Sequence, residues 1–572
     1  MTTLLSQIDQ ICRDAFAACG YEARFGELRV SDRPDLADFQ CNGVLAVAKK
    51  NRMNPIEAGE AIMEKLQGSD LFDVEFVRPG FLNFRVAEGA LIGQVSTVLN
   101  DPRGLAPRAV TPVKYLLDYG GPNLAKEMHV GHLRASIIGQ AMKTILRFAG
   151  HEAIGDIHLG DWGLQMGQLV SYIEDIRPDL LEAGSDTKIN MADLQEWYPK
   201  ASALSKDDPV FKDRARAATQ ALQSGHESYV ALWEKIRDAS VESLERDFNW
   251  LGVEFDLWYG ESRYQAALDG LVDDLLARGI AERDEGAVIV RMAEDTKMPP
   301  LFLRNSNGSY GYGATDLATI DDRIKDPLDT ILYVVDGRQG LHFKQVFAAA
   351  EACRFLDDVT AEHTAFGTVN GTDGKPFKTR AGGVMRLHDL FAEMGTAARA
   401  RLDEAGVVPG DMREKVAHQI AAAAIKFGEL SHDREKDYIF DMQQFLQFEG
   451  KTGPYIQYTC VRVRSVMANA AKEGLVPGDV SEIGEGGRDL ILCLDDFPAQ
   501  LARAIEKRKP SHLANHAYTL ADRTNRYYQQ NRILSEGVSP QAAASHLAML
   551  QAATSQLSVV LDVLGIEIPD AM

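Results

Sequence analysis

The chain of 572 residues is too long for one hydrophobic core, so we expect about three domains. Its net charge of −22 offers no general attraction to nucleic acid, so any RNA-binding surface must be local. Six scattered cysteines without a C-x-x-C pair argue against a zinc ribbon or a disulfide framework. Since no apolar stretch reaches about 18 residues, we predict no membrane span, and we expect a cytoplasmic protein without a structural metal.

Residues 1–108 mix helical patterns with short strands such as 81–86, and they end in a linker rich in Pro, Gly and Arg. From residue 113 the pattern changes to an apolar strand (113–119), a Gly/Pro/Asn loop and a helix from about 131 to Phe148. "HEAIGDIHLGD" then predicts a second strand. We interpret this order as the first half of a nucleotide-binding fold.

The same order returns later, with a strand at 330–336, a helix at 341–356 and a strand at 363–369. Strands that alternate with helices predict an α/β fold with a doubly wound, parallel Rossmann-type sheet. Between the halves we expect a helix-rich insertion at about 185–300, followed by a hairpin whose turn contains Asn307 and Gly308.

After about residue 400 the alternation stops, and helical patterns continue to the end around a loop at 473–489. We therefore predict a small α+β N-terminal domain, a catalytic domain and a C-terminal all-α helical bundle, at residues 1–108, 109–400 and 401–572.

The stretch "GPNLAKEMHVGHLRASIIGQ" (121–140) lies where a strand passes through a loop into a helix. A helix that begins at the carboxyl edge of a sheet directs its free N–H groups and positive dipole end at the ligand. His129 and His132 lie near one face of its first turn, and Gly131 leaves room for a close approach. With the ammonium of Lys126, the two imidazoles suit a triphosphate.

Two other interpretations compete for these histidines. A lone His-x-x-His is more often an ordinary surface or core pair. A metal site would need a carboxylate or a third histidine at ligand spacing, whereas Val130 and Gly131 intervene here. The position at a strand–loop–helix junction favours phosphate binding.

"HVGH" (129–132) resembles the His-x-Gly-His signature of class I aminoacyl-tRNA synthetases, and "GPNLAKEMHVGHLR" resembles its arginyl-tRNA synthetase version. The family carries a Lys-Met-Ser-Lys-Ser loop after the second half of the fold. "DGKPFKTRAGG" (373–383) is similar, with Lys375 and Lys378 at the lysine positions and Thr379 in place of the last serine. Pro376 and Phe377 depart from the pattern.

An arginine substrate needs buried carboxylates, because its planar guanidinium offers five hydrogen-bond donors. Asp118 ends the first strand, and Tyr312 and Asp316 lie one turn apart if a helix begins there. The aspartates could instead be a turn former and a helix cap. The resemblance implies that Asp118, Asn123, Tyr312 and Asp316 hold the substrate and that Gln339 lies near the guanidinium.

Candidate RNA contacts lie at both ends of the chain. In the C-terminal region, Tyr458 and Arg462 are one helical turn apart, as suits bases and phosphates, although a solvated helix face is the simpler interpretation. The resemblance to the arginyl anticodon-binding domain adds "YIQY", with Tyr455, and Tyr527. The N-terminal domain resembles the family's tRNA-elbow domain, and this resemblance places Phe81 and Asn83 against a D-loop base.

The resemblance implies ATP with Mg²⁺, L-arginine and tRNA(Arg) as substrates, with tRNA required for adenylate formation, and we expect a monomer. His129, His132, Lys126, Lys375 and Lys378 would then stabilise the transition-state charge, and Gly131 and Thr379 would contact ATP. A class I synthetase for another amino acid and a non-catalytic RNA-binding paralogue are the alternatives.

Overall fold

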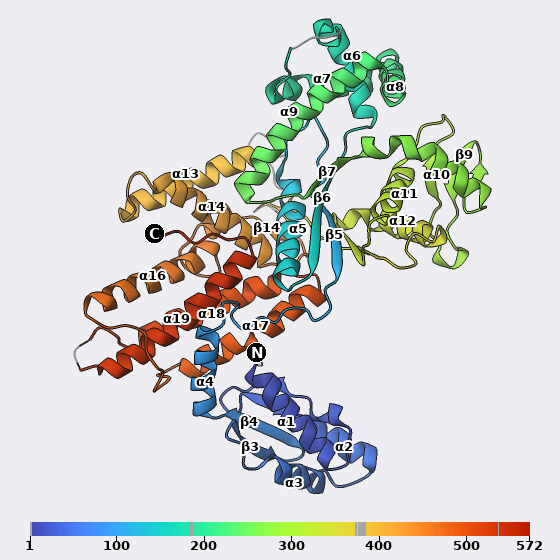
Figure 1. The fold of residues 1–572 in the computed structure, drawn as a ribbon. Coiled ribbons are helices and arrows are strands. Elements are labelled where there is room, and N and C mark those ends of the chain that lie inside the picture. The colour runs from blue at the N-terminus through green and yellow to red at the C-terminus, as the bar shows by residue number, and fades with distance from the viewer. Residues whose placement is uncertain (1–2, 183–186, 372–373, 376–384, 536) are drawn as a thin grey trace. The chain divides into compact units, whose positions relative to one another are not determined.

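The computed structural model describes residues 3–182, 187–371, 374–375, 385–535 and 537–572. The chain forms two compact units: residues 1–108 with 448–507 and 512–572, and residues 109–447 with 508–511. Residues 401–447, which we expected in the helical C-terminal domain, group with the second unit. Figure 1 shows both units.

The N-terminal part of the first unit is a four-stranded antiparallel sheet, in the order β1-β2-β4-β3, with helices. Helix α1 is amphipathic and buries Ile8, Cys12 and Phe16, while Thr3 caps its first turn. The elements are α1 (Leu4–Ala18), β1 (Arg29–Val30), β2 (Phe39–Cys41), α2 (Gly43–Asn51), α3 (Pro55–Leu66), β3 (Phe72–Val77), β4 (Phe81–Val86) and α4 (Glu88–Leu99).

The C-terminal part of the first unit is helical, as predicted, and its long loop separates the first two helices at residues 473–486. The last helix forms the core, with Leu547, Leu550 and Leu557 fully buried. Asp495 accepts hydrogen bonds from the backbone N–H groups of Leu4 and Leu5, which ties this bundle to the start of α1. The helices are α16 (Gly453–Lys472), α17 (Gly487–Glu506), α18 (Ser511–Gln530) and α19 (Pro540–Val563).

The second unit is built on a five-stranded parallel sheet in the order β12-β11-β5-β6-β7. Its central strands are buried on both faces, which is typical of parallel sheets covered by helices. The last predicted strand, at 363–369, was placed too late in the chain, because the strand ends at His363. The strands are β5 (Lys114–Tyr119), β6 (Glu152–Leu159), β7 (Leu257–Gly260), β11 (Thr330–Val334) and β12 (Thr360–His363).

Strand β7 lies inside the stretch 185–300 that we expected to be an insertion, yet it pairs with β6. The predicted hairpin around Asn307 and Gly308 is wrong in its second half. Only an isolated bridge joins Arg304 to Tyr310, because α11 begins at residue 312. The antiparallel strands here are β8 (Glu282–Asp284), β9 (Ala287–Val290) and β10 (Leu301–Arg304), in the order β10-β9-β8.

The helices of the second unit cover the sheet or extend from it (Figure 1). Their bounds are α5 (Val130–Phe148), α6 (Leu164–Ile176), α7 (Met191–Asp207), α8 (Pro209–Gln223), α9 (Glu227–Leu251), α10 (Gln265–Ala277), α11 (Tyr312–Arg323), α12 (Gly340–Ala352), α13 (Leu387–Ala405), α14 (Arg413–Leu430) and α15 (Met442–Phe445). A short parallel pair joins β13 (Val369–Asn370) to β14 (Tyr438–Ile439).

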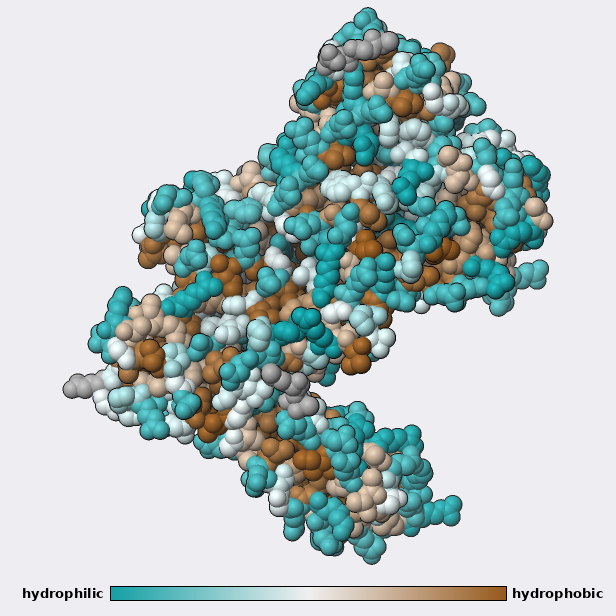
Figure 2. Space-filling model, viewed as in Figure 1, coloured by the Kyte–Doolittle hydropathy of each residue, from teal (hydrophilic) through white to brown (hydrophobic). Residues whose placement is uncertain are grey.

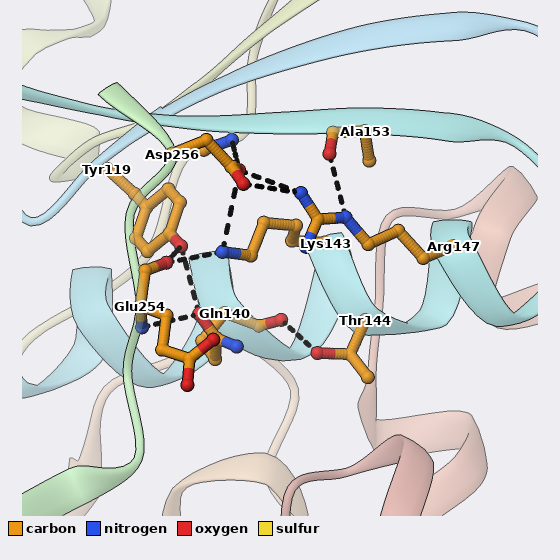
Figure 3. A network of polar contacts seen from close by, with 9 residues as sticks. Tyr119, Gln140, Lys143, Thr144, Arg147, Ala153, Glu254 and Asp256 are labelled. Atoms are coloured by element: carbon orange, nitrogen blue, oxygen red, sulfur yellow. Dashed lines mark hydrogen bonds and ion pairs between the residues drawn. The ribbon is translucent and has the colours of Figure 1, made fainter. Parts of the chain in front are cut away.

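A polar network fixes α5 to the sheet (Figure 3). The Tyr119 hydroxyl at the end of β5 donates to the carbonyl of Glu254 at 2.8 Å, and the buried Lys143 ammonium of α5 donates to the same carbonyl. Arg147 and Lys143 both pair with Asp256, just before β7. This network fixes the second half of α5 to the segment that leads into β7.

Hydrophilic residues predominate on the face seen in Figure 2. Among the described residues, no helix combines the length and the apolar character needed to cross a membrane.

Candidate active site

A cavity of about 550 Å³ opens at the carboxyl edge of the parallel sheet, where ligands of this fold class bind. Seven predicted site residues line it together, although the chain separates them by up to 221 positions: Asp118, Asn123, Gly131, His132, Tyr312, Asp316 and Gln339. The parallel register of the sheet explains why distant residues come together, since Asp118 of β5 lies beside Asp156 of β6 and Tyr333 of β11.

The two histidines cap helix α5 reciprocally. The Gly131 N–H donates to Nδ1 of His129 at 3.0 Å, and the His129 N–H donates to Nδ1 of His132 at 3.1 Å. Gly131 is needed for this packing, because a Cβ there would lie 2.7 Å from the His129 ring. Helix α5 therefore begins with both imidazoles held in place.

These caps also determine which ring nitrogen carries the proton. Since Nδ1 of each ring accepts a hydrogen bond, a neutral imidazole must carry its proton on Nε2. Burial, with a smaller effect of His129, lowers the pKa of His132 to about 3, and burial and then Lys126 lower the pKa of His129. Both rings are therefore neutral at pH 7, with Nε2–H free of the cap and able to donate to an anion.

The segment that follows the predicted lysine loop lies beside these histidines. The Val130 N–H donates to the Met385 carbonyl at 3.0 Å, and the Leu387 N–H donates to the Met128 carbonyl at 2.9 Å. Lys375 is exposed at the start of the loop, and Lys378 and Thr379 lie outside the described residues.

Lys126 does not line the 550 Å³ cavity. Its ammonium lies 4.8 Å from the ring centroid of Tyr198 on α7. It would have to turn away from this ring to reach a phosphate.

Asp118 is part of a buried charge cluster. One guanidinium nitrogen of Arg323, Nη2, lies 2.7 Å from Asp118 Oδ2 and 2.6 Å from Asp156 Oδ2. All three residues are at least 92% buried, and burial raises the pKa of Asp156. Only Asp118 of the three lines the cavity, so the cluster contributes one carboxylate to its wall.

Replacing Arg323 with methionine should therefore destabilise the protein by about 3–5 kcal/mol, because two neighbouring carboxylates would lose their shared counter-charge. Urea unfolding measures this loss. Arg323→Lys, which keeps the charge, should lose less. A methionine variant within about 1 kcal/mol of the wild type would contradict a role for this cluster in stability.

Helix α11 begins at Tyr312, so Tyr312 and Asp316 stand one turn apart, as predicted. The opposite face of α11 buries Leu317 and Ile320 in the core that α11 forms with α10 and α12, and this packing directs Asp316 toward the cavity. Asp316 Oδ2 lies 2.5 Å from Nε2 of His342.

Glu261, which follows β7 directly and lines the same cavity, is a site residue that we did not predict. Burial, and then the charges of Asp161 and Asp316, raise the pKa of Glu261 to about 7. Its neighbour along the chain, β7, is a four-residue strand that we did not predict, so nothing in the pattern placed Glu261 at the sheet edge. His342 was also missed, although it stands three residues after Gln339.

The cavity walls are acidic, with Asp118, Glu261, Asp316 and Asp336 against three histidines. Asp336 already pairs with Arg338 at 2.7 Å. The remaining carboxylates suit a ligand with two cationic groups. A second cavity of about 670 Å³ lies next to the first, and Glu261, Tyr312, Thr315 and His342 line both.

The predicted RNA contacts of the helical part differ in exposure. Tyr458 is 38% exposed, and Arg462 lies over the ring of Tyr528 at 4.8 Å. Tyr527 is only 1% exposed, and its hydroxyl bonds to His546, so its assignment as a base contact is wrong. Its neighbour along the chain, Tyr528, is half-buried and so more accessible than Tyr527.

The remaining RNA candidates are less exposed than we expected. Tyr455 is half-buried, and its hydroxyl accepts a hydrogen bond from Asn525. Phe81 is half-buried in β4, whereas Asn83 is buried and accepts a hydrogen bond from Gln40 at 2.8 Å.

Three family models match the chain: "tRNA synthetases class I (R), catalytic domain" at residues 94–442, "DALR anticodon binding domain" at 456–572 and "Arginyl tRNA synthetase N terminal domain" at 2–86. An arginine–tRNA ligase of Maricaulis maris is 42% identical and one of Hyphomonas neptunium 43% identical, each over the whole of both chains.

Solved structures agree with the fold. Arginyl-tRNA synthetase of Thermus thermophilus has a TM-score of 0.79 at 23% identity, and that of Plasmodium falciparum has 0.79 at 21%, each over the whole of both chains. The family models and the full-length relatives lead to one assignment: the chain belongs to the arginyl-tRNA synthetases, a family of class I aminoacyl-tRNA synthetases.

Proposed function

We propose that this arginine–tRNA ligase activates L-arginine with ATP in the 550 Å³ cavity and passes the arginyl group to tRNA(Arg). One observation carries the proposal: an acidic cavity lies directly beside a helix N-terminus that presents two neutral imidazoles. The acidic walls suit a cationic amino acid, and the helix end suits phosphates.

The arginine carboxylate must reach the α-phosphate, so its end of the molecule lies near α5. Asp118, at the end of β5, and Asn123, in the loop before α5, are then placed for the α-ammonium group. The side chain extends away toward α11, where Asp316, Glu261 and Tyr312 receive the guanidinium with Gln339 nearby. Leaving these carboxylates unpaired would cost several kcal/mol, which disfavours neutral amino acids. Lysine, a point charge, satisfies only one of them.

In the first step the carboxylate oxygen of arginine attacks the α-phosphorus, the bond to the bridging oxygen breaks, and pyrophosphate leaves. No protein group needs to take a proton. His129 and His132 donate through Nε2–H to the phosphate oxygens as negative charge moves onto the leaving group, and Gly131 allows the close approach. In the second step a terminal ribose hydroxyl of tRNA(Arg) attacks the arginyl carbonyl, the bond from this carbonyl to the phosphate oxygen breaks, and AMP leaves as the hydroxyl proton passes to its phosphate.

Lysines supply the remaining charge for pyrophosphate. We propose Lys375 and Lys378 from the loop and Lys126 from the other side, with Thr379 contacting ATP. ATP enters as its Mg²⁺ complex, with the metal carried on the triphosphate oxygens.

Both ends of the chain serve the tRNA in this proposal. The helical part, within residues 401–572, binds the anticodon region through Tyr455, Tyr458 and Arg462, and residues 1–108 contact the elbow through Phe81 and Asn83. The model match to an anticodon-binding domain supports the first assignment. The protein would act as a monomer in the cytoplasm, and its six free cysteines agree with a reducing compartment.

Pyrophosphate exchange across the standard amino acids, with and without total tRNA, tests the proposed function. We expect exchange with arginine alone and only when tRNA is present. Exchange with another amino acid would reject arginine specificity, and no exchange under any condition would favour a non-catalytic protein.

Tyr458 provides a test of the tRNA surface. Because an exposed ring stacked on a base contributes about 1–3 kcal/mol, Tyr458→Ala should raise the KM for tRNA about tenfold, with an unchanged KM for arginine. Tyr458→Phe, which keeps the ring, is the control and should behave like the wild type. Equal KM values for tRNA in all three proteins would remove Tyr458 from the interface.

A further inference from the structure

His342 pairs with Asp316, the carboxylate that the proposed function assigns to the guanidinium of the substrate. It lies in the first turn of α12, and its Nε2 is 2.5 Å from Asp316 Oδ2. Its side chain is 29% exposed and that of Asp316 is 25% exposed, and both line the 550 Å³ cavity. The imidazole is therefore a partner that an incoming ligand can reach and displace.

We infer that in the free enzyme the imidazole of His342 binds Asp316 where the guanidinium of arginine would bind. When arginine binds, it displaces the imidazole, and the imidazole releases its proton to solvent. The inference rests on the proposed function, because it needs Asp316 to bind the guanidinium. A cationic imidazole neutralises Asp316 while the site is empty, and the guanidinium replaces that charge when arginine binds. Retaining both cations beside one carboxylate would place like charges together.

The ionisation of His342 supports this exchange. The hydrogen bond to Asp316 raises the pKa of His342 above its usual 6.5, and burial opposes the rise. Other groups line this part of the cavity or belong to the elements packed around α12: Tyr312 on α11, Glu261 on η3 (Glu261–Tyr264), Asp118 on β5, Tyr333 on β11, Asp336 and Arg338 at η5 (Gly337–Gln339), His363 on β12 and Arg304 on β10.

Glu261 titrates in the same range, because its pKa is raised to about 7. Glu261 also loses a proton when the guanidinium of arginine binds, so the protons released on arginine binding come from two residues. A test must therefore separate His342 from Glu261.

The sign of the pH dependence follows from linkage. Below the pKa of His342, each arginine bound releases up to about one proton from this residue, so its affinity should rise with pH, by at most about tenfold per pH unit. Above the pKa, the neutral imidazole leaves Asp316 available and this dependence ends.

Calorimetry of L-arginine binding at pH 6.5, in buffers of different ionisation enthalpy, counts the protons released by the full-length protein. His342→Gln is the decisive variant, because its amide can still donate to Asp316 but cannot titrate. We expect it to release fewer protons than the wild type and to bind arginine more tightly at pH 6.5. Glu261→Gln removes the other titrating group; because Glu261 also belongs to the guanidinium site, this variant should bind arginine more weakly, but at saturating arginine it should still release the proton of His342. A second variant, His342→Asn, repeats the test with a shorter amide.

Equal proton release by the wild type and both His342 variants would overturn the inference. Asp316→Asn separates this failure from failure of the proposed function. If Asp316→Asn binds arginine as tightly as the wild type, the assignment of Asp316 to the guanidinium is wrong, and the inference fails with it. If Asp316→Asn binds weakly while the His342 variants release as many protons as the wild type, only the inference is wrong.

Discussion

Replacing His132 with asparagine is expected to lower the rate of arginine activation at least about a hundredfold, or by roughly 2.7 kcal/mol of transition-state stabilisation. The Asn Oδ1 can still accept the His129 N–H as Nδ1 of His132 does, so the cap on α5 persists. What disappears is the Nε2–H donor. Pyrophosphate exchange measures the rate, and the KM for arginine should stay close to that of the wild type.

His132→Gln is the matched control, because its amide nitrogen lies near the position of Nε2. It should retain more activity than the asparagine variant, although it weakens the cap. Unchanged turnover in His132→Asn would reject phosphate stabilisation by this residue. A fall in stability that matches the fall in rate would instead assign His132 to the fold alone.

Replacing Asp316 with asparagine should raise the KM for arginine by about 10² to 10³-fold, because the guanidinium loses a charged partner in a half-buried site. The ATP KM should change little, since Asp316 lies on α11 and the phosphates are assigned to α5. Steady-state exchange kinetics with arginine varied at saturating ATP and tRNA measure this effect.

Asp321, on the same helix, provides a control carboxylate because it pairs with Lys325, one turn further along the chain, and does not line the cavity. Asp321→Asn should keep the wild-type KM for arginine. If both variants raise this KM equally, the rise comes from the lost negative charge on the helix, and a direct contact between Asp316 and the guanidinium is rejected.

The phosphate side of the site could be predicted from local sequence. Val130–Phe148 forms the expected helix, and Asp118 ends the expected strand, because hydrophobic periodicity and the glycine-rich loop act over short distances. The parallel sheet then brings Asp118 and Asp316 to one cavity, as the alternation of strands and helices predicts.

The rest depended on contacts that sequence patterns do not encode. Strand β7 has four residues, too few for a periodic signal, so Glu261 was not placed at the sheet edge. The partners of Asp118 and Asp316, Arg323 and His342, depend on side-chain directions. Tyr527 was misassigned because adjacent tyrosines on a helix face different sides, and this helix buries Tyr527 and leaves Tyr528 half-buried.

A crystal structure of the protein with a non-hydrolysable arginyl-adenylate analogue locates both substrates at once. We predict that its phosphate lies within hydrogen-bond distance of Nε2 of His129 or His132, and that its guanidinium contacts Asp316 in place of His342. Adenosine bound far from residues 129–132, or a guanidinium away from Asp316 and Glu261, would contradict this site.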